Sequence, residues 1–237
     1  MRELFRFRET AATIVCEPEH LQVVKRGIFE ARDIIESKIA DDPFFGITYD
    51  PYPPSGKDDP LIRRMCEASV LAGVGPMAGV AGAVAVYGVE AAREAGAREA
   101  IVENGGDIAF LSYRRMPIGV FADHPVFRDV AFDMRHDGIT GICSSSAKIG
   151  PSVSFGGSDV CTVFSDDVIL ADCCATALGN LVTGEGAVSE ALESIAAIEG
   201  VRGCMAVCGD KVAVCGDVPE LIPARLDTVL GGSGANL

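Results

Sequence analysis

Residues 100–111 read Ala100-Ile-Val-Glu-Asn-Gly-Gly-Asp-Ile-Ala-Phe-Leu111, with two apolar runs on either side of Asn104-Gly105-Gly106-Asp107. Apolar runs around an Asn-Gly or Gly-Gly step predict two antiparallel strands joined by a tight turn. Paired glycines also permit positive φ and a close approach of a ligand to the backbone, here beside an amide and a carboxylate. The stretch predicts either a simple hairpin turn, which the pattern favours, or a ligand-binding bend.

Strand patterns on both sides of this hairpin are grouped rather than separated one by one by helices. We expect an N-terminal strand pair within residues 5–16, a helix over 17–39 and two helices within 58–95, broken at Gly73-Val-Gly-Pro76. Further strands are expected at 118–121, 130–133, 139–143 and 160–164, helices at 167–181 and 188–198, and a last hairpin at 203–215. Runs of strands mixed with helix pairs predict an α+β fold with mixed or antiparallel sheets and packed helices.

The whole chain, residues 1–237, is predicted to form a single domain, because no internal repeat or linker is evident. Its N-terminal part, residues 1–60, would hold a hairpin, a helix and a segment rich in Asp, Pro, Tyr and Gly that reads as an ordered excursion or lid. The core, residues 61–230, would carry a ligand cleft.

Composition excludes several classes of protein. Hydrophobic residues make up 49% of the 237 residues, which is enough for a sizeable core and excludes global disorder. The net charge of −14 and the absence of Trp argue against a nucleic-acid partner.

Residues 68–89 carry no charge, but their many Gly and Ala residues predict a buried helix rather than a membrane span. With no apolar leader at the N-terminus, we expect a cytoplasmic protein with no membrane partner.

The residues Asp172 and Thr176 lie in the segment Ala171-Asp-Cys-Cys-Ala-Thr-Ala-Leu178, which is predicted to be helical. Four residues apart on a helix, they share one face. A carboxylate with a hydroxyl suits a hard cation such as Mg²⁺. An acid in a first helical turn and a Thr bonded to the preceding turn explain the same pattern without a metal.

Two further stretches contain residues suited to anions. Gly75-Pro-Met-Ala-Gly-Val-Ala-Gly82 opens a helix and can hold an anion at its N-terminus, although tight helix packing explains it equally well. The segment around Ser144 and Ser145 offers hydroxyls, one lysine (Lys148) and glycines for a phosphate or pyrophosphate, or forms an ordinary loop. The nine cysteines form no Cys-x-x-Cys pair, so zinc is unsupported and most thiols are expected to be reduced and packed in the core.

In chain order, four segments resemble the motifs of the ApbE superfamily, which comprises FAD:protein FMN transferases and flavin-binding proteins. They are Met77–Gly82, Glu103–Ile108, Gly141–Ser145 and Ala171–Leu178, which are similar to G-G-I-A-K-G, N-x-G-G-D-I, T-S-G and A-D-A-L-A-T-A-L. The N-terminal segments further resemble the uncharacterised ApbE-like branch of archaea and anaerobic bacteria. This resemblance implies an ApbE-like fold that binds FAD or FMN, or another small phosphate-bearing ligand, together with Mg²⁺.

The resemblance also assigns residues to the two parts of this site. It implies that the flavin nucleotide lies against Asn104, Gly105, Gly106, Asp107, Ser144 and Ser145. It implies that Mg²⁺ is held by the side chains of Asp172 and Thr176 and by the backbone carbonyl of Ala81.

The chain departs from the transferase pattern at two places. Gly82 stands where the family motif has Lys, and residues 146–157 lack the His of the family's preceding segment. Without that His, flavin transfer lacks the general acid–base residue that the family pattern supplies, so the sequence leaves transferase activity undecided. The alternative is an accessory protein in sulfur assimilation or homocysteine biosynthesis, with Cys143 and Cys173 or Cys174 as reactive carriers. Glycine-rich packing faces are compatible with a homodimer.

Overall fold

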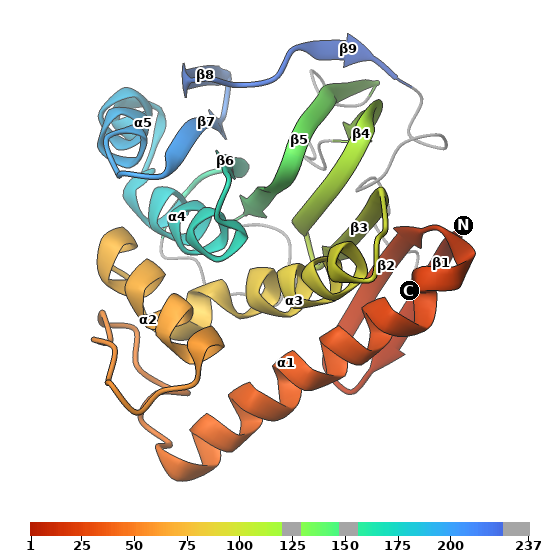
Figure 1. Ribbon diagram of the computed structural model, residues 1–237. Helices are drawn as coiled ribbons and strands as arrows, with labels where there is room; N and C mark the ends of the chain where they lie inside the picture. Colours follow the sequence, from red (N-terminus) through yellow and green to blue (C-terminus); the bar gives the residue numbers. More distant parts are fainter. Residues whose placement is uncertain (120–128, 147–155, 225–237) are drawn as a thin grey trace.

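The computed structural model describes residues 1–119, 129–146 and 156–224 (Figure 1). Within them, nine strands form one sheet in the order β1-β2-β3-β4-β5-β6-β7-β8, with β9 paired to β5. The strands are β1 (Arg2–Phe7), β2 (Thr10–Cys16), β3 (Glu99–Asn104), β4 (Asp107–Gly119), β5 (Val130–Ser145), β6 (Val160–Ser165), β7 (Val201–Cys208), β8 (Lys211–Gly216) and β9 (Leu221–Pro223). Every pairing is antiparallel, so the predicted α+β class is confirmed.

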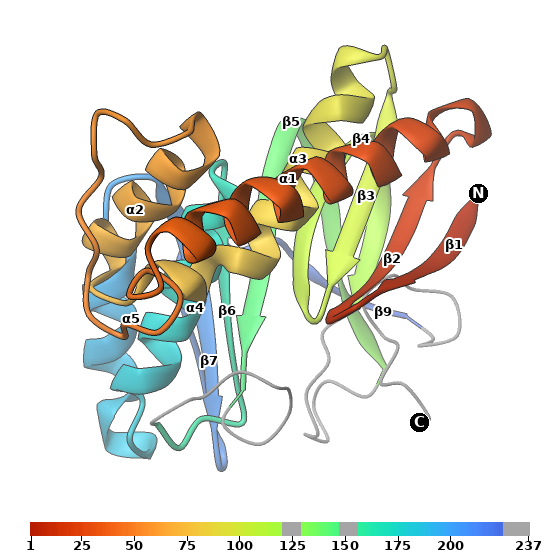
Figure 2. The ribbon, with the colours of Figure 1, turned by 90° about the horizontal axis from the view of Figure 1, so that it is seen from below.

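Five α-helices cover one face of this sheet, as Figures 1 and 2 show. They are α1 (Leu21–Asp41), α2 (Pro60–Ala72), α3 (Val80–Glu94), α4 (Val168–Leu181) and α5 (Val188–Ala196), with short three-ten helices at Pro18–His20, Pro76–Gly79 and Glu185–Ala187. Because successive strand residues point to opposite faces, the sheet separates two apolar clusters. The larger cluster lies between the helices and the sheet, and the smaller one contains the buried ring pair Phe132–Phe164 on the opposite face.

The central strands β4 and β5 are longer than the sequence predicts. The separately predicted strands at 130–133 and 139–143 are one continuous strand, and β4 continues from the predicted strand at 108–111 to Gly119. Register shifts between Phe110 and Met116 interrupt the pairing of β4 with β5 without ending either strand. The extra residues at these irregularities disturb the alternating pattern, so the sequence predicts several short strands where the structure has two long ones.

The break between α2 and α3 lies where glycine and proline predict it. Asp59 caps α2 by accepting a hydrogen bond from the Leu61 amide at 2.8 Å. The helix ends at Gly73, whose φ of 71° is left-handed and favours glycine. No single helix in the described part of the chain is long and apolar enough to span a membrane; α2 and the helical segment Pro76–Glu94 pass that test only together, bent by 110°.

Residues 42–59 form an ordered segment between α1 and α2 that packs against the end of α2. The Phe45 side chain is fully buried, and the Tyr52 amide donates to the Ser69 hydroxyl at 3.0 Å. The Ser69 hydroxyl in turn donates to the Val74 carbonyl at 2.5 Å. These contacts tie the excursion to the segment that leads into α3; its role as a lid stays a prediction.

Candidate functional site

The Gly105-Gly106 bend is a two-residue hairpin turn between β3 and β4. Asn104 pairs directly with Asp107, and the two glycines have φ angles of 70° and 106°. Positive φ at both central positions is the geometry of a tight hairpin that asparagine and glycine favour. The hairpin interpretation is therefore confirmed, and the bend leaves Gly105 exposed beside two buried polar side chains.

One line of directly paired residues crosses the sheet from this turn, on the face that the helices cover. We call it the helix-facing row; its members are Ala12, Asn104, Asp107, Cys143, Val163, Cys204 and Cys215. Because paired residues on neighbouring strands share a face, these side chains all point toward the helices. The row places Asp107 beneath α4, the helix that carries Asp172.

Three distant segments meet at Asp107. The Asn104 side chain donates to the Ala81 carbonyl at 3.2 Å, which connects the turn to the start of α3. The Gly82 amide donates to Oδ2 of Asp172 at 2.7 Å, which connects α3 to α4. The predicted convergence of the bend, the start of α3 and the Asp172 helix is thus present.

Gly82 lets α3 and α4 approach closely enough for this contact. A Cβ at this position would lie 2.9 Å from the Val168 carbonyl oxygen and 3.0 Å from Cβ of Asp172. Contacts this short are essentially absent between real side chains and backbone atoms. Any side chain at this position would therefore require α3 and α4 to move apart.

Asp107 and Asp172 form a buried carboxyl pair, with exposed fractions of 8% and 6%. Burial raises the pKa of Asp172 to about 7, partly offset by the backbone amides of Gly82 and Ala81. Burial and the neighbouring charge of Asp172 raise the pKa of Asp107 well above its usual value. Among the described residues, no basic side chain is one of the groups that shift either pKa. The pair therefore holds a proton near neutral pH unless a cation joins it.

One oxygen of this pair is left without a partner. Oδ1 of Asp107 is buried and accepts no hydrogen bond from any described residue. A buried polar atom of this kind is costly and is usually explained by strain, catalysis or an absent water or ion. This orphaned oxygen lies beside the residues that the sequence assigned to a metal and a ligand.

The side chains of the other predicted site residues do not all point toward the site. Thr176 is half-buried one helical turn beyond Asp172, as predicted. The Ser144 hydroxyl pairs with Oγ1 of Thr162 at 2.9 Å, on the face opposite the row. Ser144 reaches the site through its backbone, which hydrogen-bonds the Asp107 carboxyl. Ser145 is buried and, by alternation, points to the same face as Cys143.

The oxygens that the resemblance assigns to the metal are the Asp172 carboxylate, the Thr176 hydroxyl and the Ala81 carbonyl, and the buried Cys143 thiol also lies at this carboxyl pair, hydrogen-bonded to Asp107. Among the described residues, no group of three or more His, Cys, Asp or Glu side chains is arranged to hold a metal. That excludes, for this part of the chain, a site built entirely from such side chains. A hard cation that keeps water and ligand oxygens needs only one or two carboxylates, so the residues present fit Mg²⁺.

The cysteines proposed as sulfur carriers are in the wrong environment for that chemistry. Cys143, Cys173 and Cys174 are fully buried. Burial raises the pKa of Cys143 and of Cys173 well above the usual value, and it raises the pKa of Cys174 to about 12. A carrier thiol needs a lowered pKa and access to solvent, so this arrangement disfavours the sulfur-transfer alternative.

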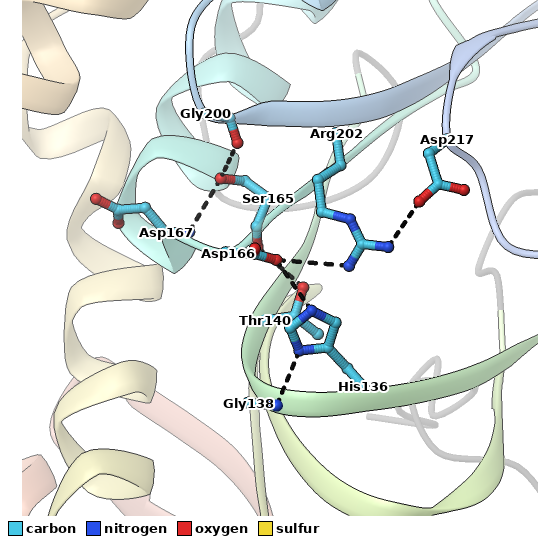
Figure 3. A network of polar contacts seen from close by, with 9 residues as sticks. All are labelled: His136, Gly138, Thr140, Ser165, Asp166, Asp167, Gly200, Arg202 and Asp217. Atoms are coloured by element: carbon cyan, nitrogen blue, oxygen red, sulfur yellow. Dashed lines mark hydrogen bonds and ion pairs between the residues drawn. The ribbon is translucent and has the colours of Figure 1, made fainter.

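The start of α4 is held by a polar network that the sequence did not indicate (Figure 3). The Asp167 carboxylate caps the helix, and the Ser165 hydroxyl accepts from the Asp167 amide at 3.0 Å while donating to the Gly200 carbonyl at 2.7 Å. Beside it, His136 and Arg202 both contact Asp166, at 3.2 and 3.5 Å. This network fixes the helix that presents Asp172.

His124 lies outside the described residues, as do residues 147–155.

Comparisons of the sequence with known proteins show which proteins this chain is similar to. A family model described as "AbpE bacteria" matches residues 6–214. A UPF0280 protein of Methanothrix thermoacetophila is 45% identical over 95% of this chain and 96% of its own, and one of Methanoregula boonei is 43% identical over the full length of both.

Solved structures of two flavin transferases share the fold. The flavin transferase ApbE from Vibrio cholerae superposes with a TM-score of 0.62 and 12% identity, over 94% of this chain and 96% of that one. The apo flavinyl transferase ApbE of Pseudomonas stutzeri gives 0.59 and 12%, over 91% and 94%. At these identities the likeness concerns the fold, and it confirms the predicted ApbE-like architecture.

Proposed function

This chain belongs to the AbpE bacteria family, in an ApbE-like branch shared with the archaeal UPF0280 proteins, and from that premise we propose that it binds a flavin nucleotide together with Mg²⁺. The phosphates would lie against the Gly105-Gly106 bend. The metal would be held by Asp172, Thr176 and the Ala81 carbonyl. The observation that carries the proposal is the buried, unpartnered Oδ1 of Asp107 beside Asp172.

Charge supports the presence of a cation in this site. A phosphate-bearing ligand would meet two buried carboxyls, and in the part of the chain that the structure describes no basic side chain is among the groups that shift their pKa values. Three negative groups brought together in a buried setting repel one another strongly unless a cation lies between them. Mg²⁺, when bound, neutralises phosphate charge and acts as a Lewis acid. We therefore expect flavin binding to require the metal.

The residues of the chain itself would position the ligand rather than transfer it. Asn104 holds the bend against α3 through the Ala81 carbonyl, and Gly105 exposes its backbone to a phosphate. Gly82 stands where the family motif has lysine, and any side chain there would require α3 and α4 to move apart. The proposal is accordingly limited to binding, with FAD or FMN as the ligand class.

Fluorescence titration tests this proposal directly. The chain contains no Trp, so flavin emission can be followed without interference from protein indole. We expect FAD or FMN to bind in the presence of Mg²⁺ and to be released by a chelator. Absence of binding to either flavin, with and without Mg²⁺, would refute the proposal.

A further inference from the structure

The far end of the helix-facing row carries two cysteines on neighbouring strands. Cys204 on β7 pairs directly with Cys215 on β8, and Gly209 and Asp210 form the turn of that hairpin. β8 is the last strand in the sheet order of the described residues. Cys204 and Cys215 lie three and four strands from Asp107 along the row, about 14 Å and about 19 Å at the usual strand spacing, and take no part in the proposed flavin site.

The geometry of the pair is compatible with a covalent bond. Residues directly opposite one another in antiparallel strands have Cα atoms about 4.5–5.5 Å apart. Disulfides span Cα separations of about 4.4–6.8 Å. Both side chains contribute to the cluster between the sheet and the helices, so their sulfur atoms point to the same side. The neighbouring Cys215 thiol adds to the effect of burial in raising the pKa of Cys204 to about 12.

The two thiols differ in access to solvent. Cys204 is fully buried and donates a weak hydrogen bond to the Leu192 carbonyl of α5 at 3.5 Å. Cys215 is half-buried, whereas the other eight cysteines are buried. An external reagent therefore meets Cys215 first, with Cys204 directly behind it on the next strand.

Other thiols near Cys204 are less well placed for a bond to it. Cys161 pairs with Ala206, so it lies diagonally from Cys204 rather than opposite. Cys174 approaches Cys204 from α4 and is itself fully buried. Cys208 faces Lys211 across the hairpin and has no cysteine opposite.

We propose that Cys215 and Cys204 form a redox-modifiable pair that reacts with small-molecule disulfides to give a cross-strand disulfide. The Cys215 thiolate attacks a disulfide X–S–S–X, forms a mixed disulfide and releases one X–SH after proton uptake. Cys204 then loses its proton, attacks the Cys215 sulfur and releases the second X–SH. Two protein thiols are oxidised to one disulfide, and one small disulfide is reduced to two thiols. The product would link β7 to the edge strand β8.

Mass spectrometry of the native full-length protein after incubation with oxidised glutathione tests the pair. Trypsin cleaves after Arg202 and Lys211, so the two cysteines fall in separate peptides, Gly203–Lys211 and Val212–Arg225. We expect the intact protein to lose the mass of two hydrogen atoms and these two peptides to be joined. A stable glutathione adduct on Cys215 without this link would overturn the proposal, and so would an unmodified protein.

Three variants separate the contributions of the cysteines. Cys208→Ala removes the other thiol of the first peptide and should leave the link intact. Cys204→Ala should convert the product into a lasting glutathione adduct on Cys215, and Cys215→Ser should abolish both products. A link that persists in Cys204→Ala, or that joins the peptide holding Cys161 and Cys174, would contradict the assignment. Far-ultraviolet circular dichroism checks that each variant is folded.

Discussion

The acidic residues Asp166, just before α4, and Asp172, within it, have opposite surroundings. Near the helix start, Asp166 is 64% exposed and contacts both His136 and Arg202. Farther along the helix, Asp172 is buried against Asp107, and no basic side chain of the described ranges is among the groups that shift its pKa. The first arrangement satisfies its charges within the protein; the second leaves one carboxyl oxygen unpartnered.

The surroundings of Asp166 are those of a structural ion-pair network, whereas those of Asp172 are typical of a ligand-binding site. Buried carboxyls without a cationic partner cost stability, and proteins retain such arrangements chiefly where function requires them. Exposed ion pairs contribute little and serve mainly to position elements. We infer that the Asp107–Asp172 pair is kept for an external cation, and that the His136–Arg202 network orients the helix.

The largest expected effect is on ligand binding. Asp172→Asn removes the carboxylate that would hold the metal, so flavin affinity in Mg²⁺ should fall on the order of 100-fold, as loss of a charged ligand predicts. Flavin fluorescence titration measures the change. The matched control is Asp166→Asn, which makes the same substitution in the exposed network and should bind as the wild type does. Equal losses in both variants would break the distinction between the two regions.

A steric prediction concerns the contact between α3 and α4. Gly82→Ala places a methyl group against the Val168 carbonyl, and overpacking of this kind costs about 1–3 kcal/mol in the free energy of unfolding. Chemical denaturation with and without Mg²⁺ measures the loss. Gly56→Ala is the control, because no atom lies within 4 Å of a Cβ there. A Gly82→Ala variant as stable as Gly56→Ala would show that the helices are not closely packed at the site.

A pH-dependent prediction follows from the raised pKa of Asp107. Its folded-state pKa lies above the unfolded value, so the folded state binds more protons and stability is lost as pH rises above about 4. Asp107→Asn does not titrate, so without metal it should be more stable than the wild type at pH 7, on the order of 1–2 kcal/mol. The advantage should shrink toward pH 4. Thermal unfolding in a chelator across this range tests the sign, and an advantage that grows at low pH would contradict it.

The smallest effects are expected at the start of α4. Asp167 accepts hydrogen bonds from the Ile169 and Leu170 amides at 2.9 and 3.3 Å. Replacing such a cap with alanine costs about 1 kcal/mol, so Asp167→Ala should lower the unfolding free energy by that amount. Asp166→Asn removes only exposed ion pairs and should change it by less than about 0.5 kcal/mol. The reverse order, measured by urea denaturation, would mean that the ion pairs rather than the cap hold the helix.

Local chemistry in the sequence was sufficient to predict several features. The paired glycines specified the hairpin, and the spacing of Asp172 and Thr176 placed both on one face of a helix. The break after α2 followed from Gly73 and Pro76. Each of these depends on residues adjacent or one turn apart, where backbone preferences and side-chain periodicity act directly.

Other features depend on contacts between distant segments and were missed. The coupling of Asp107 to Asp172 and the hydrogen bond from Gly82 arise only when the turn, α3 and α4 pack together. The continuity of β5 was hidden because the β4–β5 pairing shifts register twice, with extra residues on β5 between His136 and Thr140 and on β4 between Ser112 and Met116, which a pattern of alternating residues does not reveal. The register that sets Cys204 opposite Cys215 follows from the final hairpin, which was predicted at residues 203–215, although the pair itself was not recognised.

The central claim is that a divalent cation and a flavin phosphate meet between the Gly105-Gly106 bend and α4. A crystal grown with Mn²⁺ in place of Mg²⁺ and with FAD tests it most directly, because Mn²⁺ is located by its anomalous scattering. We predict an anomalous peak within bonding distance of Asp172 and Thr176, with phosphate density against Gly105. A peak elsewhere, or flavin density away from this bend, would contradict the account.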